Sequence, residues 1–114
     1  MQCVPFDREA FHAGEHANIH GEGIELCGRA SQTHAQWLDT LSLPMLAIAA
    51  RIVRWRCDQL GLPLELRDHA ALRQLQPGIT THAELARAFP KETTHRDPGP
   101  GFPLAEFLEA IRAA

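Results

Sequence analysis

The chain has 114 residues, of which 45% are apolar and 22% charged, and its net charge is −3 with neutral histidines. This length favours a single domain, residues 1–114, because domains usually hold about 100–200 residues. The acidic balance and the scattered Lys and Arg argue against a nucleic-acid-binding surface. The longest apolar stretch, residues 45–50, is too short to cross a bilayer, and residues 1–8 lack a secretory signal pattern. We therefore expect a protein that is made in the cytoplasm and makes no membrane contact.

The cysteines and histidines differ in what they indicate. Cys3, Cys27 and Cys57 are odd in number and lack the C-x-x-C spacing, which excludes a full disulfide framework and a cysteine-only zinc site. Seven histidines are many for a chain of this length. They are the first indication that the chain carries a functional site.

The first third of the chain predicts two strands separated by a loop. Residues 2–6 alternate weakly and contain a proline, which is typical of a short edge strand. Residues 7–21 are polar and contain two glycines, so we expect a loop. Residues 23–28 form a short apolar run between glycines, which predicts a buried, central strand interrupted by one acid.

The middle of the chain gives the strongest secondary-structure signal, a long helix. Ser31 or Thr33 can cap a short helix that begins near His34. Over residues 45–60, apolar residues recur at helical spacing, with Pro44 suited to the first turn and glycine to the position after the end. We expect the broad apolar face of this helix to pack across the sheet.

The last part predicts a third strand and three further helices. Residues 62–66 alternate as a strand does, Asp68 can cap a short helix over residues 69–75, and Thr80 or Thr81 can cap another. A loop rich in Pro, Gly and Thr covers residues 89–101, before an amphipathic helix formed by Leu104, Phe107, Leu108 and Ile111. The order predicts an α/β fold with a mixed sheet of about three strands flanked by helices.

Glu25 is the first candidate for chemistry. In a strand, its neighbours Ile24 and Leu26 face one side of the sheet and Glu25 faces the other. The carboxylate then either faces solvent or lies at the floor of a cleft, where partial burial would suit it to act as a base near neutral pH.

His82 and Asp97 are candidate metal ligands. Imidazole nitrogen and carboxylate oxygen both bind zinc, and a catalytic site needs three protein ligands with one position left for water. Asp97 precedes Pro98 in a loop that Pro100 and Pro103 also stiffen, so it can be held in place at little entropic cost. The alternatives are a helix-start histidine in water and an ordinary turn before the last helix.

The histidines at positions 12, 16 and 20 have i, i+4, i+8 spacing, which on a helix would form a metal-binding face. Gly14, Asn18 and Gly21 disfavour a helix there. We therefore regard a three-histidine site as the weaker hypothesis.

Four segments, taken in order, resemble motifs of the zinc-dependent N-acetylmuramoyl-L-alanine amidases. They are Val-Pro-Phe-Asp followed by Phe-His-Ala-Gly, at residues 4–7 and 11–14; an Asn followed by Gly-Ile-Glu-Leu, within residues 18–26; Gly-Ile-Thr-Thr-His, at residues 78–82; and Thr-His-Arg-Asp-Pro-Gly-Pro-Gly-Phe-Pro, at residues 94–103. The last has the form found in phage endolysins. Together the motifs span nearly the whole chain.

The resemblance implies a role for each matching residue. His82 and Asp97 would be zinc ligands, and Glu25 would be the catalytic acid and base. His95 would polarise the scissile carbonyl, and His12 and Asn18 would lie beside the substrate. Phe11 and Thr81 replace the Trp and Gly usual in the family.

The resemblance also implies the fold and the reaction. Relatives carry their first zinc histidine ahead of the segment that matches Gln2, so we expect that ligand and at least one core strand to be missing. The implied activity is zinc-dependent cleavage of the peptidoglycan amide between N-acetylmuramic acid and L-alanine, on the cell wall or on cytoplasmic muropeptides. The alternative is a non-catalytic peptidoglycan-binding module without a complete zinc site.

Overall fold

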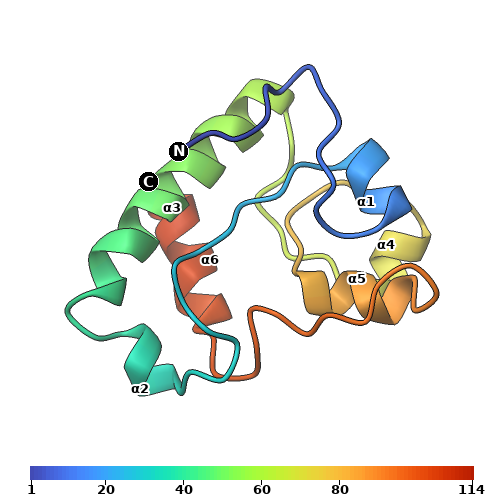
Figure 1. Ribbon diagram of the computed structural model, residues 1–114. Helices are drawn as coiled ribbons and strands as arrows, with labels where there is room; N and C mark the ends of the chain where they lie inside the picture. Colours follow the sequence, from blue (N-terminus) through green and yellow to red (C-terminus); the bar gives the residue numbers. More distant parts are fainter.

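The computed structural model describes residues 1–114 and consists of six helices joined by extended segments and turns (Figure 1). The helices are α1 (Glu15–His20), α2 (His34–Trp37), α3 (Ser42–Leu60), α4 (His69–Arg73), α5 (His82–Ala88) and α6 (Leu104–Ala113). The one β-type pairing is an isolated parallel bridge between Leu66 and Ile79. The predicted α/β fold with a mixed sheet is therefore wrong. None of the helices combines the length and the apolar character that a membrane crossing requires.

The predicted strands fail because they have no partners. Residues 22–28 make no backbone–backbone hydrogen bond, whereas a strand in a sheet is defined by such bonds to its neighbours. The segment runs extended beside α3, where the side chain of Leu26 packs on the core while Ile24 remains 45% exposed (Figure 1). Residues 2–6 are likewise irregular, and residues 62–66 contribute only the single bridge. Solvent can satisfy the free peptide groups of these exposed segments.

The predicted helices are present because their caps are local. The hydroxyl of Thr33 accepts a hydrogen bond from the Gln36 amide in a reciprocal capping box. The side chains of Asp68 and Thr81 cap α4 and α5 by accepting from the amides of Ala71 and Glu84. Gly61 ends α3 in the left-handed conformation that favours glycine, with φ of 64°.

Helix α3 begins at Ser42, three residues before the predicted start at Met45. The Asp39 carboxylate explains the difference, because it accepts hydrogen bonds from the amides of Leu41 and Ser42 at 3.1 and 2.7 Å. These bonds lower the pKa of the Asp39 carboxyl, with the Ser42 amide as the main cause.

The predicted loop over residues 7–21 contains helix α1, so this prediction is wrong for its second half. Gly14 and Gly21 flank the helix rather than interrupting it, and Gly14 has φ of 95°, a value that suits glycine. Ala17 faces inward and is buried, while Glu15 lies in the first turn, where a negative charge is favourable.

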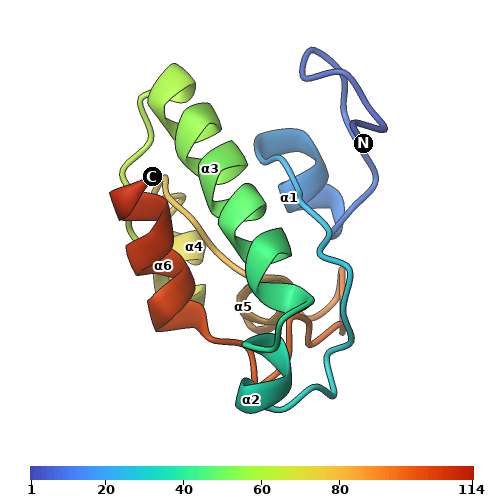
Figure 2. The same cartoon turned by 90° about the vertical axis from the view of Figure 1, so that its left-hand side faces the viewer.

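Two clusters of buried apolar side chains organise the molecule. We call the larger one the first core; α3 and α6 lie side by side around it in both views (Figures 1 and 2). Its buried members are Trp37, Leu46, Ala49, Ala50, Phe102, Phe107 and Ile111. Helix α3 was predicted to pack across a sheet, and it packs on α6 instead.

The smaller cluster, which we call the second core, lies among α1, α4 and α5. It consists of Ala13, Ala17 and Leu85, with Leu72 and Phe89 packed against them. Most of the candidate site residues belong to the segments around this second core.

Candidate metal centre

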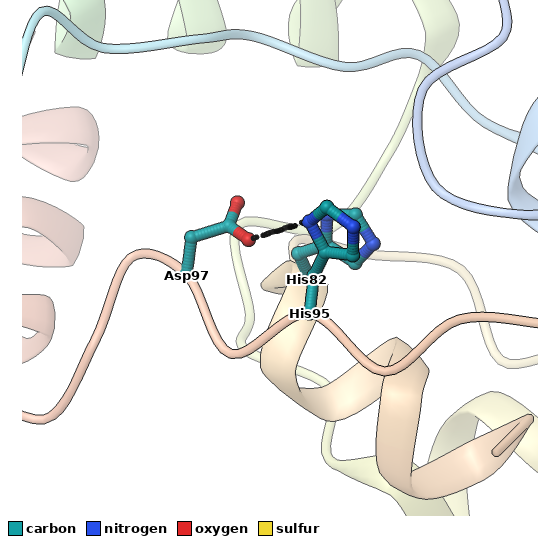
Figure 3. Close-up of side chains that lie close together, drawn as sticks. All are labelled: His82, His95 and Asp97. Atoms are coloured by element: carbon teal, nitrogen blue, oxygen red, sulfur yellow. Dashed lines mark ion pairs between the residues drawn. The ribbon is translucent and has the colours of Figure 1, made fainter. Parts of the chain in front are cut away.

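His82, His95 and Asp97 lie together, although they come from a helix start and from the loop before α6 (Figure 3). One potential ligand atom of each lies within 4.8 Å of the others. The Nδ1 atom of His82 is 3.5 Å from Oδ1 of Asp97, and Nδ1 of His95 is 3.8 Å from the same oxygen. The two imidazole rings are stacked, with centroids 4.8 Å apart and planes inclined by 6°.

The backbone explains how residues 15 positions apart come together. The first amides of a helix have no partner within the helix. In α5, the Thr81 hydroxyl accepts from the Glu84 amide, and the carbonyl of Asp97 accepts from the Ala83 amide at 3.0 Å. The start of α5 thus binds the loop that carries Asp97 and places that carboxylate beside His82.

On its other side, the Asp97 loop is packed against residues 30–33. A Cβ atom added at Gly99 would lie 1.9 Å from the carbonyl oxygen of Ala30, and one added at Gly101 would lie 2.1 Å from that of Gln32. Gly99 also has φ of 92°, which disfavours other residues. The glycines of the Asp-Pro-Gly-Pro-Gly segment therefore allow a close approach of two backbones, in addition to the stiffness that its prolines provide.

The donor set and its spacing fit a zinc ion. A separation of 3.5 Å between His82 and Asp97 is too long for a good hydrogen bond. It is close to the ~3.3 Å that separates two ligand atoms, each about 2.0–2.1 Å from a tetrahedral zinc ion. The His82 side chain is 14% exposed and those of His95 and Asp97 are 70% and 53% exposed, so the cluster is open to an ion and a substrate.

His12 and Asn18 line the same open pocket as His82 and His95. The pocket has a volume of about 410 Å³ and is also bordered by Phe11 and by the segment from Pro90 to Thr94. The side-chain oxygen of Asn18 accepts hydrogen bonds from the amides of His12 and Ala13, at 2.7 and 3.1 Å. Asn18 thereby holds the His12 segment at the pocket wall.

Glu25 is the one candidate that belongs neither to this pocket nor to the group of His82, His95 and Asp97. It is exposed, lies in the extended segment 22–28, and is neither among the residues lining the pocket nor in the His82, His95 and Asp97 group. The partial burial considered for Glu25 on the floor of a cleft is absent.

The three histidines at positions 12, 16 and 20 do not form a metal-binding group. His16 stacks on Phe89, with ring centroids 4.2 Å apart, and its Nδ1 lies 2.8 Å from Oε1 of Glu92. The hydrogen bond from the His16 side chain is the main reason why the pKa of the Glu92 carboxyl is lowered. This pair ties α1 to the loop that borders the pocket.

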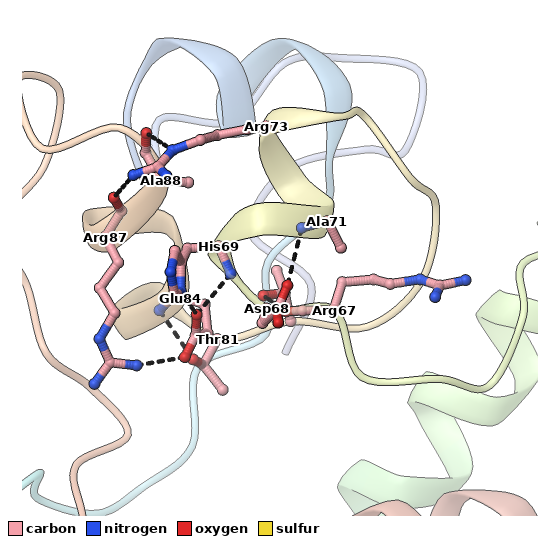
Figure 4. Close-up of polar contacts among 10 residues, drawn as sticks. Arg67, Asp68, His69, Ala71, Arg73, Thr81, Glu84, Arg87 and Ala88 are labelled. Carbon is pink, nitrogen blue, oxygen red and sulfur yellow. Dashed lines mark hydrogen bonds and ion pairs between the residues drawn. The ribbon is translucent and has the colours of Figure 1, made fainter.

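A polar network around Glu84 holds α4 against α5 (Figure 4). Its carboxylate accepts from the His69 amide at 2.7 Å, lies 3.0 Å from Nδ1 of His69, and pairs with Arg87. Burial acts to raise the pKa of Glu84, but the hydrogen bonds from His69 and the charge of Arg87 outweigh it, so the pKa is lowered. Arg73 adds hydrogen bonds to the carbonyls of Arg87 and Ala88, at the end of α5.

Sequence reasoning missed Thr93, whose Oγ1 lies 2.6 Å from Nε2 of His82. The contact joins a loop residue to a helix residue 11 positions away, and no local pattern signals it. Only the closeness of Thr93 to the His-Arg-Asp-Pro segment could have drawn attention to it.

Comparison with known families agrees with the motif order. The model of the N-acetylmuramoyl-L-alanine amidase family matches residues 1–100. No curated protein and no solved structure gives a significant match to the chain. The matched region carries a histidine and carboxylate cluster beside an open pocket, which is an arrangement suited to a metal-dependent hydrolase. The chain belongs to the N-acetylmuramoyl-L-alanine amidase family, and the resemblance seen in the sequence is confirmed.

Proposed function

We propose that the protein, acting as one domain, is a peptidoglycan hydrolase that cleaves the amide between the lactyl group of N-acetylmuramic acid and L-alanine. Family membership supports the reaction class. The observation that carries the proposal is the 3.5 Å spacing between Nδ1 of His82 and Oδ1 of Asp97, which suits two ligands of one zinc ion. The substrate would be cell-wall peptidoglycan, as for a phage endolysin, or muropeptides released from it.

His82 and Asp97 would hold the zinc ion in this proposal. A zinc ion so held supplies Lewis acidity and a bound water whose pKa is lowered to about 7. His95 stands beside the pair with a largely exposed side chain. It would donate a hydrogen bond to the scissile carbonyl oxygen, where negative charge develops during the attack of water.

The remaining roles belong to residues on the other walls of the site. His12 and Asn18 would contact the substrate in the pocket. Glu25 would take the proton of the attacking water and return it to the departing amine of L-alanine. Segment 22–28 makes no backbone–backbone hydrogen bonds, and its polar contacts to α3 are those of the Cys27 amide with Met45 and of Glu22 with Arg56, so it can approach a bound substrate without loss of secondary structure.

The test combines zinc content with muropeptide cleavage followed by mass spectrometry. We expect His82→Ala and Asp97→Ala to lose both zinc and cleavage, because each removes a ligand. Glu25→Gln should lose cleavage and keep zinc, since a general base is not a ligand. Glu109→Gln, on the exposed face of α6, is the matched control and should change neither. Cleavage that survives His82→Ala would reject the proposal.

His95→Ala distinguishes two uses of that side chain. If His95 acts on the carbonyl, the variant loses cleavage and keeps its zinc affinity. The 3.8 Å distance to Asp97 also allows Nδ1 of His95 to act as a third ligand, in which case zinc affinity falls as well.

A non-catalytic peptidoglycan-binding module is the second candidate. The position of Glu25 outside the pocket favours it, because a binding module needs no general base. Binding of muropeptides by the wild-type chain, with zinc supplied in excess and no cleavage product, would establish this alternative.

A further inference from the structure

Thr93 contacts the side of His82 that faces away from Asp97. Its hydroxyl oxygen lies 2.6 Å from Nε2 of His82, while Nδ1 of the same ring faces the Asp97 carboxylate (Figure 3). A neutral imidazole carries a single proton, on one of its two nitrogens. The partner of each nitrogen determines which of them carries it.

The two sides of the His82 ring offer unequal acceptors. A proton on Nε2 has the Thr93 hydroxyl oxygen as an acceptor at 2.6 Å. A proton on Nδ1 would have only Oδ1 of Asp97, at 3.5 Å, which is beyond normal hydrogen-bond length. Because the His82 side chain is only 14% exposed, water offers little compensation. In the metal-free ring the Thr93 hydroxyl can accept from Nε2 or donate to it, but a metal ion that binds the Nδ1 lone pair leaves the ring proton on Nε2, where the Thr93 hydroxyl accepts it.

We propose that Thr93 is a positioning residue for the zinc site: when Nδ1 of His82 binds the ion, the Thr93 hydroxyl accepts the Nε2 proton and so holds the ring with Nδ1 on the Asp97 side. This inference rests on the proposed zinc amidase function and names a residue that acts through His82. A metal-bound histidine is oriented by the partner of its other nitrogen, and loss of that partner typically costs about 10- to 100-fold in metal affinity.

The loop around Thr93 is itself held in place, which gives the hydroxyl a defined position. The amides of Glu92 and Thr93 both donate to the carbonyl of Phe89, at 3.0 and 3.4 Å. The Glu92 carboxylate is bound by the side chain and the amide of His16. Thr93 therefore approaches His82 from a turn that is tied to both α5 and α1.

The first measurement is the zinc affinity of the 114-residue chain, by competition with a chromophoric chelator. Thr93→Val keeps the branched shape and removes the hydroxyl, so we expect about 10- to 100-fold weaker binding. Thr93→Ser restores the hydroxyl and should restore most of the affinity. Thr94→Val is the matched control, because the neighbouring Thr94 makes no hydrogen bond to His82, and it should bind zinc as the wild type does.

The second measurement follows the Nε2–H proton of His82 in the zinc-loaded chain by NMR, through its exchange with water. We expect slow exchange in the wild type and in Thr93→Ser, where the hydroxyl accepts this proton, and faster exchange in Thr93→Val. A variant that merely loosened the fold would alter many resonances, not this ring proton alone.

The outcomes separate this inference from the function on which it rests. Wild-type zinc affinity in Thr93→Val, with unchanged exchange of the His82 Nε2 proton, would overturn the role of Thr93 and leave the amidase proposal standing. A wild-type chain that binds no zinc would overturn both. Weaker zinc binding in Thr93→Val that Thr93→Ser does not reverse would also contradict a role for the hydroxyl.

Discussion

The half of the molecule around α3 and α6 and the half around α1, α4 and α5 are stabilised in different ways. The first core contains three aromatic rings in edge-to-face contact, Trp37, Phe102 and Phe107, with large aliphatic side chains around them. The buried members of the second core are two alanines and Leu85. Ion pairs and hydrogen bonds around the second core take the place of buried apolar area. The chief ones are those of Glu84 and Glu92.

The contrast between the two cores helps to explain where the candidate functional site lies. His82 begins α5, and the pocket is bordered by the α1 region, so the candidate site depends largely on the second core. Buried apolar area is the main source of folding free energy, and binding loops are generally drawn from the less stable parts of a fold. The first core thus provides most of the stability. The second core positions the polar and titratable side chains of the candidate site.

The largest expected effect is in the first core. Phe107→Ala should lower the free energy of unfolding by about 3–5 kcal/mol, because it leaves a cavity among large side chains. Urea denaturation measures the change, with Glu109→Ala on the exposed face of the same helix as the control. A loss below about 1 kcal/mol would show that the first core is not the main source of stability.

The equivalent change in the second core should cost less. Leu85→Ala should lower the free energy of unfolding by about 2–3 kcal/mol, near the lower end of such substitutions, because its small neighbours leave less packing to lose. It should also weaken zinc binding, since α5 carries His82. A destabilisation equal to that of Phe107→Ala would contradict the division into a stronger and a weaker core.

The Glu84 network gives a smaller, pH-dependent effect. Glu84→Gln should lower the free energy of unfolding by about 1–2 kcal/mol near neutral pH, because hydrogen bonds to a charged group are lost. The pKa of Glu84 is lowered in the folded protein, so its contribution is present above the ordinary glutamate value of about 4.3 and is lost as the pH falls through the lowered value. Urea denaturation at several pH values should find wild type and variant converging in acid. A difference in the free energy of unfolding that does not change with pH would contradict the assignment of this stabilisation to the Glu84 carboxylate.

The smallest effect is expected at Glu92, whose carboxylate contacts His16 alone, whereas that of Glu84 contacts both His69 and Arg87. Glu92→Gln should speed amide hydrogen exchange in α1, because the variant has a weaker bond to His16, and leave α3 unchanged. The pKa of Glu92 is lowered as well, so the protection it gives to α1 should fade as the pH drops below the ordinary glutamate range. Equal exchange in α1 of both proteins near neutral pH would show that the pair contributes nothing to holding that helix.

The helices could be predicted from the sequence and the sheet could not, for one physical reason. Thr33, Asp68 and Thr81 each act on the amide three residues ahead, so each cap is visible in the sequence. A strand depends on partners that are distant in sequence, and the alternation around Ile24 says nothing about whether they exist. Helix α1 was missed because its glycines were interpreted as breakers, when they stand at its two ends.

Only those parts of the candidate metal centre that lie in recognisable sequence motifs could be predicted from the sequence. The segments around His82 and Asp97 are recognisable motifs, and these residues do lie near each other. The contacts that place them are the Ala83 amide with the Asp97 carbonyl, Thr93 with His82, and Gly99 with Ala30. All join segments that are separate in the sequence, and no local propensity reveals them. Whether Glu25 serves as the base stays a prediction.

Asp97 is bonded to α5 through the Ala83 amide, and two residues later its loop packs on residues 30–33, next to the first core. A metal ion held by His82 and Asp97 would therefore link the half of the molecule around the second core to the half around the first core. It would strengthen the weaker half by RT ln(1 + [Zn]/Kd), which is about 2.7 kcal/mol at 100 times Kd. The converse is that each opening of α5 would release the ion. With excess chelator present, the rate of zinc loss would then measure how often that helix opens, so the metal would report on motion as well as chemistry.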